Sequence, residues 1–333
     1  MPRATPLLLV LALLVSGCGA RPAAALTAVP PEGGRYRLWQ DASIFVCVRQ
    51  LLDGATSGQA LWVEMYEFGR ADLASALTAA RDRGADVRVV VDRTVPESAR
   101  TASRLAAAGV AVRAYPVDDR RHQIDHVKLL LAGDTAVVGG MNWGRSSAAN
   151  HDYALETGAE EVVLRLRAIF AQDWTLAGGA PAPLRAAAGP VAQTSPGEEV
   201  RDRLLGALRL SRHSVDAELF VLTDPDVLAE LASVRRRGGR VRVLLDPGQD
   251  ASRPSFELLR AAGVEARWYP LPPGAKLHAK AALFDGRRLL LGSANWSQGG
   301  LSVNHELDLM ADDPAAATAF ARRFDRDWSA SGG

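Results

Sequence analysis

Residues 278–296 read HAKAALFDGRRLLLGSANW, and the rest of the chain can be interpreted from this stretch. His278 and Lys280 lie two residues apart among small and apolar residues, so a strand would place both side chains on one face. Asp285 and Gly286 are a typical tight-turn pair, and the leucines that follow suit a returning strand. An imidazole beside an ammonium makes a poor metal site, because the cation opposes the metal. The same pair suits a phosphate.

A second copy of the pattern occupies residues 126–143, which read HVKLLLAGDTAVVGGMNW. Three positions of the first stretch recur in it as His126, Lys128 and Asn142. The turn is one residue shorter, so Gly133 stands where an aspartate is expected and Asp134 follows it. Gly140 replaces the serine, which leaves this copy without a hydroxyl.

Both stretches resemble the HKD motif of the phospholipase D superfamily: His, one residue, Lys, four residues, Asp, six residues and Gly-Ser-x-Asn. The later stretch fills every position and ends in Gly292, Ser293 and Asn295. The earlier one ends in Gly139, Gly140 and Asn142, and a Gly-Gly first motif with a Gly-Ser second motif resembles the cardiolipin synthase branch. We assign a structural role in the motifs to four residues: Asp285, Asp134, Gly292 and Gly139.

The two motifs belong to a long internal repeat. Glu64-Met65-Tyr66 recurs as Glu218-Leu219-Phe220, and other matches share the same offset of 154 residues. A repeat of this size is a domain rather than a solenoid unit. In each copy, apolar strands alternate with helices, which predicts a largely parallel sheet covered on both faces. The expected strands are 60–66, 87–91, 214–221 and 241–245, and the expected helices are 71–83, 97–108, 225–237 and 255–262.

The predicted fold is therefore α/β, with two tandem phospholipase D-like sandwich domains related by a pseudo-twofold axis. We expect one site at the interface between the domains, and therefore a monomer with intramolecular domain pairing. The expected organisation is a signal peptide at 1–18, a tether at 19–35, a first domain at 36–175, a linker at 176–197 and a second domain at 198–333.

The N-terminus predicts export. An apolar run over residues 6–15 is too short to span a bilayer and is typical of a signal peptide. The run leads into Val15-Ser16-Gly17-Cys18, which resembles a bacterial lipoprotein signal cut before a lipidated Cys18. An ordinary signal peptide cut near 23–25 is the alternative. We expect a cell-envelope protein with a lipid anchor on the extracytoplasmic side of a membrane.

The resemblance implies a two-histidine reaction on a phosphodiester. One histidine attacks phosphorus and becomes a phosphohistidine, while the other protonates the leaving alkoxide. By analogy, His126 is the nucleophile and His278 the general acid. Lys128 and Lys280 face the phosphoryl oxygens, to which Asn142, Asn295 and Ser293 donate hydrogen bonds. Asp152 and Glu306 follow the two motifs at equivalent positions and orient the histidines. The roles of His122, His151 and His305 stay open, and the reaction requires no metal or cofactor.

Composition favours a lipid over nucleic acid as the substrate. The chain has 39 basic and 38 acidic residues, a balance that predicts no general attraction to nucleic acid. Trp143 and Trp296 follow the motif asparagines and suit acyl chains, base stacking or core packing equally. We expect hydrolysis of glycerophospholipid head groups. The alternatives are a cardiolipin-synthase-like phosphatidyltransferase, a metal-independent endonuclease and an inactive lipid- or phosphate-binding protein.

Overall fold

A computed structural model describes residues 1, 35–182, 189–195 and 197–332. Residues 2–18 of the predicted signal, including Cys18, and all but residue 35 of the predicted tether lie outside the described residues. Within the described part, no helix combines the length and apolar character needed to cross a bilayer.

The first domain is built on a seven-stranded sheet with the order β1-β7-β6-β5-β2-β3-β4. Strands β2, β3 and β4 are mutually parallel, whereas β5, β6, β7 and β1 add in antiparallel fashion. The elements are β1 (Tyr36–Gln40), α1 (Ser43–Gly54), β2 (Ala60–Met65), α2 (Ala71–Asp82), β3 (Asp86–Val91), α3 (Pro96–Ala107), β4 (Ala111–Ala114), β5 (Lys128–Ala132), β6 (Thr135–Gly139), β7 (Tyr153–Thr157) and α4 (Glu160–Leu176).

The second domain repeats this arrangement with the order β8-β14-β13-β12-β9-β10-β11. Its elements are β8 (Val191–Thr194), α5 (Glu199–Leu210), β9 (Ser214–Leu219), α6 (Pro225–Arg236), β10 (Arg240–Leu245), α7 (Arg253–Ala261), β11 (Glu265–Trp268), β12 (Lys280–Phe284), β13 (Arg288–Gly292), α8 (Gln298–Ser302), β14 (Glu306–Asp312) and α9 (Pro314–Ala330). Asp-Pro pairs begin two of these helices: Asp224 caps α6 and Asp313 caps α9, each by accepting two backbone N–H groups.

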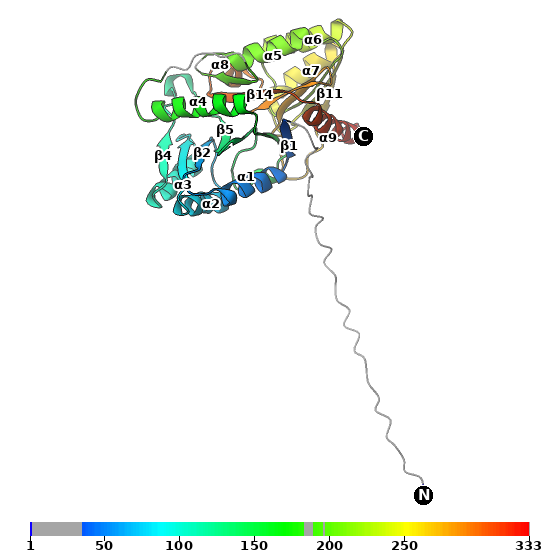
Figure 1. The fold of residues 1–333 in the computed structure, drawn as a ribbon. Coiled ribbons are helices and arrows are strands. Elements are labelled where there is room, and N and C mark those ends of the chain that lie inside the picture. Colours follow the sequence, from blue (N-terminus) through cyan, green and yellow to red (C-terminus); the bar gives the residue numbers. More distant parts are fainter. Residues whose placement is uncertain (2–34, 183–188, 196, 333) are drawn as a thin grey trace.

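The two sheets face each other across a central core shared by both domains. Strands β13 and β14 contact β6, and β13 also contacts β7. Apolar side chains from both inner faces meet there, together with α4 and α9. Helices α1 to α3 cover the outer face of the first sheet, and α5 to α7 cover that of the second. Figure 1 shows α1 and α2 on one side of the molecule and α5 and α6 on the other.

Backbone hydrogen bonds join the domains reciprocally beside the two motifs. The N–H of His126 donates to the carbonyl of His305, and the N–H of His278 donates to the carbonyl of His151, each over 2.8 Å. Equivalent residues exchange equivalent contacts, as expected of two domains related by a pseudo-twofold axis.

The α/β class and the two tandem domains are confirmed. The parallel part of each sheet is limited to three strands, because the motif hairpins and the last strand add as antiparallel neighbours. Strand β8 lies in the segment expected to be linker and pairs with β14, as β1 pairs with β7. Residues 191–194 therefore belong structurally to the second sheet.

Candidate active site

Buried aspartates at the ends of β3 and β10 hold the segment that precedes each motif histidine. Asp92 accepts the N–H of Asp125 over 2.7 Å, and Asp246 accepts the N–H of Leu277 over 2.7 Å. The other carboxylate oxygen of each aspartate accepts an N–H of its own loop. Both motif segments are thereby fixed before their lysines enter β5 and β12.

Each motif histidine takes its carboxylate partner from the opposite domain. His126 Nδ1 lies 2.9 Å from Glu306 Oε2, and His278 Nδ1 lies 2.8 Å from Asp152 Oδ2. All four side chains are buried. With Nδ1 donating to a carboxylate, Nε2 of each ring keeps its lone pair. In His278 this atom also lies 3.2 Å from the Lys280 ammonium.

The two carboxylates have unequal surroundings. Glu306 accepts hydrogen bonds from the Ser293 hydroxyl over 2.5 Å and from the Asn304 amide over 3.0 Å. Asp152 accepts the Tyr153 N–H over 2.8 Å and packs where the first motif has Gly140. A Cβ at Gly140 would lie 2.4 Å from Asp152 Oδ1, so glycine makes room for the carboxylate. Extra donors favour an ionised Glu306 over an ionised Asp152.

The different surroundings of Glu306 and Asp152 give the two carboxyl groups different pKa values. Burial raises the pKa of Asp152 to about 7, although Lys280 opposes the shift. Burial acts in the same direction on Glu306, but His126, Lys128 and Ser293 outweigh it and hold the Glu306 pKa below its ordinary value. Burial lowers the pKa of His126 to about 4 despite Glu306. At neutral pH, Glu306 is therefore ionised beside a neutral His126. Burial, with Lys280 and Lys128, also lowers the pKa of His278 well below its ordinary value, so a proton bound by the pair of Asp152 and His278 resides on the carboxyl group.

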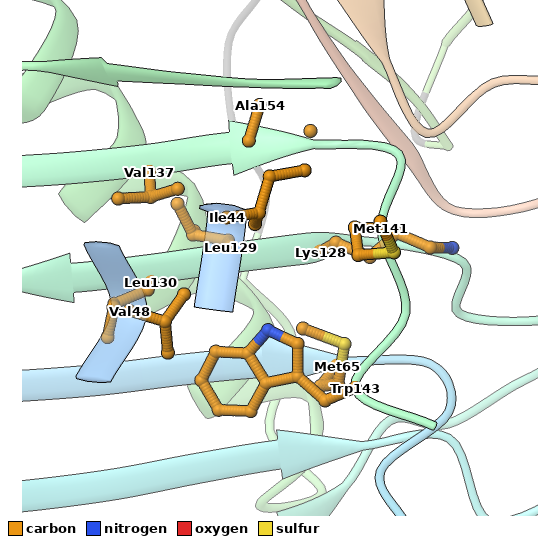
Figure 2. Close-up of a pocket in the computed structure, with 11 residues that line it drawn as sticks. Ile44, Val48, Met65, Lys128, Leu129, Leu130, Val137, Met141, Trp143 and Ala154 are labelled. Carbon is orange, nitrogen blue, oxygen red and sulfur yellow. The ribbon is translucent and has the colours of Figure 1, made fainter. Parts of the chain in front are cut away.

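Lys128 and Lys280 are buried beside the motif histidines. Burial lowers the pKa of Lys128 to about 7 and that of Lys280 to about 8, although nearby carboxylates oppose both shifts. Each ammonium donates to the backbone carbonyl of its own motif histidine. Figure 2 shows Lys128 among apolar side chains that include Met65 and Trp143, with its nitrogen directed away from Val48 and Val137.

The structure places the three predicted phosphate donors differently. Ser293 is fully buried and bonded to Glu306 and to the N–H of Leu307, so its hydroxyl orients the carboxylate instead of facing a phosphate. The Asn142 amide donates to Glu67 over 3.0 Å. Among the described residues, the buried Oδ1 atoms of Asn142 and Asn295 have no hydrogen-bond partner. A phosphate at Asn142 would therefore compete with Glu67.

Three of the four residues assigned to motif structure take such a role. A Cβ at Gly139 or Gly292 would lie 2.4 Å or less from atoms of the neighbouring strand, so both glycines permit close strand pairing. Asp285 has φ 53° in the turn and accepts the N–H groups of residues 212–214. Asp134 is different: its side chain is exposed and pairs with Arg167, while Gly133, with φ 54°, takes the turn position.

Two aromatic residues of the site were not assigned from the sequence. Tyr66 packs edge-on against His126 with ring centroids 4.9 Å apart, and Phe220 lies 4.8 Å from His278. Both are aromatic and lie 154 residues apart, the offset of the repeat, and this recurrence could have identified them as residues of the site. Trp143 and Trp296 are buried in the outer cores, so of the three expected uses the structure shows core packing.

His151 and His305 form buried clusters apart from the reacting histidines. His151 lies between Asp41 and Glu218, and its ring stacks on Tyr269. His305 contacts Asp173 and stacks on Tyr115. Burial disfavours charge on both rings, but the carboxylates outweigh it and raise each pKa to about 9. His122 is exposed.

Comparison with known proteins agrees with this geometry. The family model described as "Cardiolipin synthase, PLD-like domain" matches residues 48–174 and 204–328. Human mitochondrial cardiolipin hydrolase is 36% identical over 133 residues, which cover 40% of this chain and 52% of the relative. The protein of the same name from Chlamydomonas reinhardtii is 31% identical over 127 residues, covering 38% and 56%. The chain thus spans about half the length of the curated relatives it matches.

Solved structures share the two-domain fold. Phosphatidylserine synthase from Haemophilus influenzae superposes with a TM-score of 0.69 at 13% identity, covering 88% of this chain and 86% of that one. Polyphosphate kinase from Porphyromonas gingivalis gives 0.65 at 17% identity, covering 87% and 46%. At such identities the likeness concerns the fold alone. The family match extends over most of both domains and includes both motifs, and the chain therefore belongs to the phospholipase D superfamily, whose members act on phosphodiester bonds.

Proposed function

We propose that the protein hydrolyses glycerophospholipid phosphodiesters through a phosphohistidine intermediate. His126 attacks phosphorus, and the phosphorus–oxygen bond to the leaving group breaks as His278 gives that oxygen a proton. Water then attacks the phosphohistidine while His278 takes up a proton, which regenerates both rings.

His126 with Glu306 and His278 with Asp152 are pairs that cross between the domains, and the unequal protonation of the carboxylates in these crossed pairs supports this division of roles. A nucleophile must be neutral, and His126 beside ionised Glu306 meets that requirement. A general acid needs a proton near working pH, and the Asp152 carboxyl group, whose pKa burial raises to about 7, lies 2.8 Å from His278 Nδ1 and can supply one to the pair. The two ammonium groups add positive charge for the phosphoryl oxygens.

The choice of a lipid rests on the comparisons and on charge. The matching family model is described as a cardiolipin synthase domain, and the curated relatives are named cardiolipin hydrolases. A nuclease that holds several backbone phosphates needs a basic track, whereas the whole chain carries a net charge of +1. A lipid anchor at Cys18 would also hold the site beside its substrate.

The test is a parallel assay of purified protein on cardiolipin and other phospholipids in mixed micelles, and on single- and double-stranded DNA at matched phosphate. We expect head-group release with water as acceptor and a phosphorylated peptide containing His126. His126→Ala and His278→Ala should each abolish turnover, while a circular dichroism spectrum like that of the wild type would show an intact fold.

Each alternative has its own signature. Products extended by glycerol or another alcohol, in preference to hydrolysis, would indicate a phosphatidyltransferase. DNA cleavage without head-group release would overturn the lipid assignment and leave the two-histidine mechanism standing. Binding of phospholipid without any turnover would indicate a binding protein.

A further inference from the structure

Two buried clusters flank the reacting residues and are related by the internal repeat. The first contains Glu64, Asp125, Asp173 and His305, and the second contains Asp41, Glu218, Asp327, His151 and Arg323. Glu64 and Asp173 correspond to Glu218 and Asp327 at the common offset of 154, as His305 corresponds to His151. Each cluster therefore serves as an internal control for the other.

The second cluster contains its own positive charge. Arg323 contacts Asp41 over 2.7 Å and Asp327 over 2.6 Å. Both nitrogens of His151 face carboxylates, Asp41 through Nδ1 and Glu218 through Nε2. The guanidinium and a doubly protonated imidazole together balance the buried acids.

The first cluster lacks the arginine that compensates the buried acids of the second cluster. Ile169 stands where the repeat places Arg323, and Asp125 adds a carboxylate where the second motif segment has Leu277. Three buried acids thus face one histidine. Among the described residues, no N–H or hydroxyl group donates to either oxygen of Glu64 or to Oδ2 of Asp125, and both side chains are fully buried. Glu64 instead faces the carboxyl groups of Asp125 and Asp173. Isolated buried carboxylates of this kind are costly unless a cation or a proton joins them.

The orientation of His305 suits metal coordination. Its Nδ1 donates to the Ser195 carbonyl over 2.6 Å, an arrangement that leaves Nε2 as the coordinating atom. That atom lies 3.1 Å from Asp173 Oδ2 and 3.7 Å from Glu64 Oε1. Donors about 2.0–2.2 Å from a shared Zn²⁺ lie roughly this far apart.

We propose that Glu64, Asp173 and His305 bind one divalent transition-metal ion, with Asp125 as the adjacent fourth carboxylate. Imidazole and carboxylate donors together suit Zn²⁺ or Mn²⁺. Because these ligands coordinate an ion in their deprotonated forms, binding releases protons. The donors come from both domains and are closed off from solvent, so the ion has a structural role.

Such an ion would stabilise the position of one crossed pair, formed by His126 and Glu306. His305 precedes Glu306 in the chain, and its carbonyl accepts the N–H of His126. Asp125 precedes His126 directly. The metal would thus fix the backbone on both sides of the pair formed by His126 and Glu306, while the phosphodiester reaction itself proceeds without it.

The experiment measures metal in the purified mature protein, prepared without a polyhistidine tag, by mass spectrometry. We expect about one equivalent of Zn²⁺ or Mn²⁺ per chain. Glu64→Gln replaces a charged ligand and should lower metal affinity by at least the roughly 10- to 100-fold that loss of a ligand's outer partner costs. Glu218→Gln removes the matched carboxylate of the second cluster and should leave the metal content unchanged.

A second measurement keeps the test independent of whether Glu64→Gln folds. Wild-type protein is unfolded with a chelator and refolded with or without Zn²⁺, Mn²⁺ or Fe²⁺. Thermal unfolding should shift to higher temperature and saturate at one equivalent of ion. Wild-type protein that contains no metal and shows no ion-dependent shift would overturn the proposal, as would equal metal loss in both variants. Diester hydrolysis is assayed separately, so either outcome leaves the proposed function open to its own test.

Discussion

The crossed pairing predicts that Asp152→Asn in the first domain disables the histidine of the second domain. Asp152 Oδ1 accepts the Tyr153 N–H, and Oδ2 faces His278 Nδ1 over 2.8 Å. In the variant, the amide oxygen keeps the bond to Tyr153, so the amide NH₂ faces the ring. A donor at that place makes Nδ1 an acceptor and puts the only ring proton on Nε2.

A neutral His278 in that tautomer is a poor acid, because giving up its proton would leave an imidazolate. The expected loss is the whole contribution of the general acid, about 10²–10⁴-fold in kcat on a phospholipid whose alkoxide must be protonated. Asn closely matches Asp in size, so the fold should be retained.

The assay compares two leaving groups. A nitrophenyl phosphodiester releases its phenolate without a proton, so the first turnover should survive in Asp152→Asn as a rapid burst near one equivalent. The phosphohistidine should then accumulate on His126, because the water that releases it lacks its base. Absence of the burst in this variant, together with its retention in Glu306→Gln, would reverse the two roles. Full turnover on phospholipid would refute the crossed pairing itself.

Three further predictions concern protonation, strand packing and the anchor. On phospholipid, kcat/KM should fall as pH rises through about 7, where the pair of Asp152 and His278 loses its proton, and a pH profile of wild type against Asp152→Asn checks this. Gly292→Ala should cost about 1–3 kcal/mol in urea unfolding, because the new Cβ would lie 2.2 Å from Asp308 Oδ1. Gly206→Ala, in open space on α5, should instead add about 0.5–1 kcal/mol. We expect Cys18→Ser to move the protein from the membrane to the soluble fraction, and undiminished membrane retention would contradict the lipid anchor.

The repeat and its motifs allowed much of the fold to be predicted. Strand and helix bounds agree to within a few residues, because apolar runs and glycine stops recur in both copies. Strand β8 was missed because four residues after Pro190 carry too little pattern to distinguish a strand from a linker. Asp134 was misplaced because the shortened turn offers two candidate positions, and backbone conformation gives the turn to Gly133.

Side-chain direction was the harder problem within the site. The sequence indicated that Asp152 and Glu306 belong with the histidines, but pairing within a domain and pairing across domains are equally compatible with their spacing. The packing of β13 and β14 against the first sheet produces the crossing. The partner of Ser293 was equally open from the sequence, because a hydroxyl can donate to a phosphate or to a carboxylate. In the structure it donates to Glu306. The proposed metal site brings Glu64 and His305 together although they are far apart in the sequence, and no motif with short spacing would have predicted it.

The crossed pairs also bear on how such a protein can evolve. A half-chain that carries one histidine and one carboxylate holds neither pair, so it becomes competent only by meeting a second copy. Fusion of two copies into one gene guarantees that meeting and frees the halves to diverge, as Gly140 with Asp152 and Ser293 with Glu306 already have. Divergence stays coupled, however, because His126 and Glu306 must change in concert although 180 positions separate them. Co-variation is therefore expected between positions in different halves, at the crossed pairs.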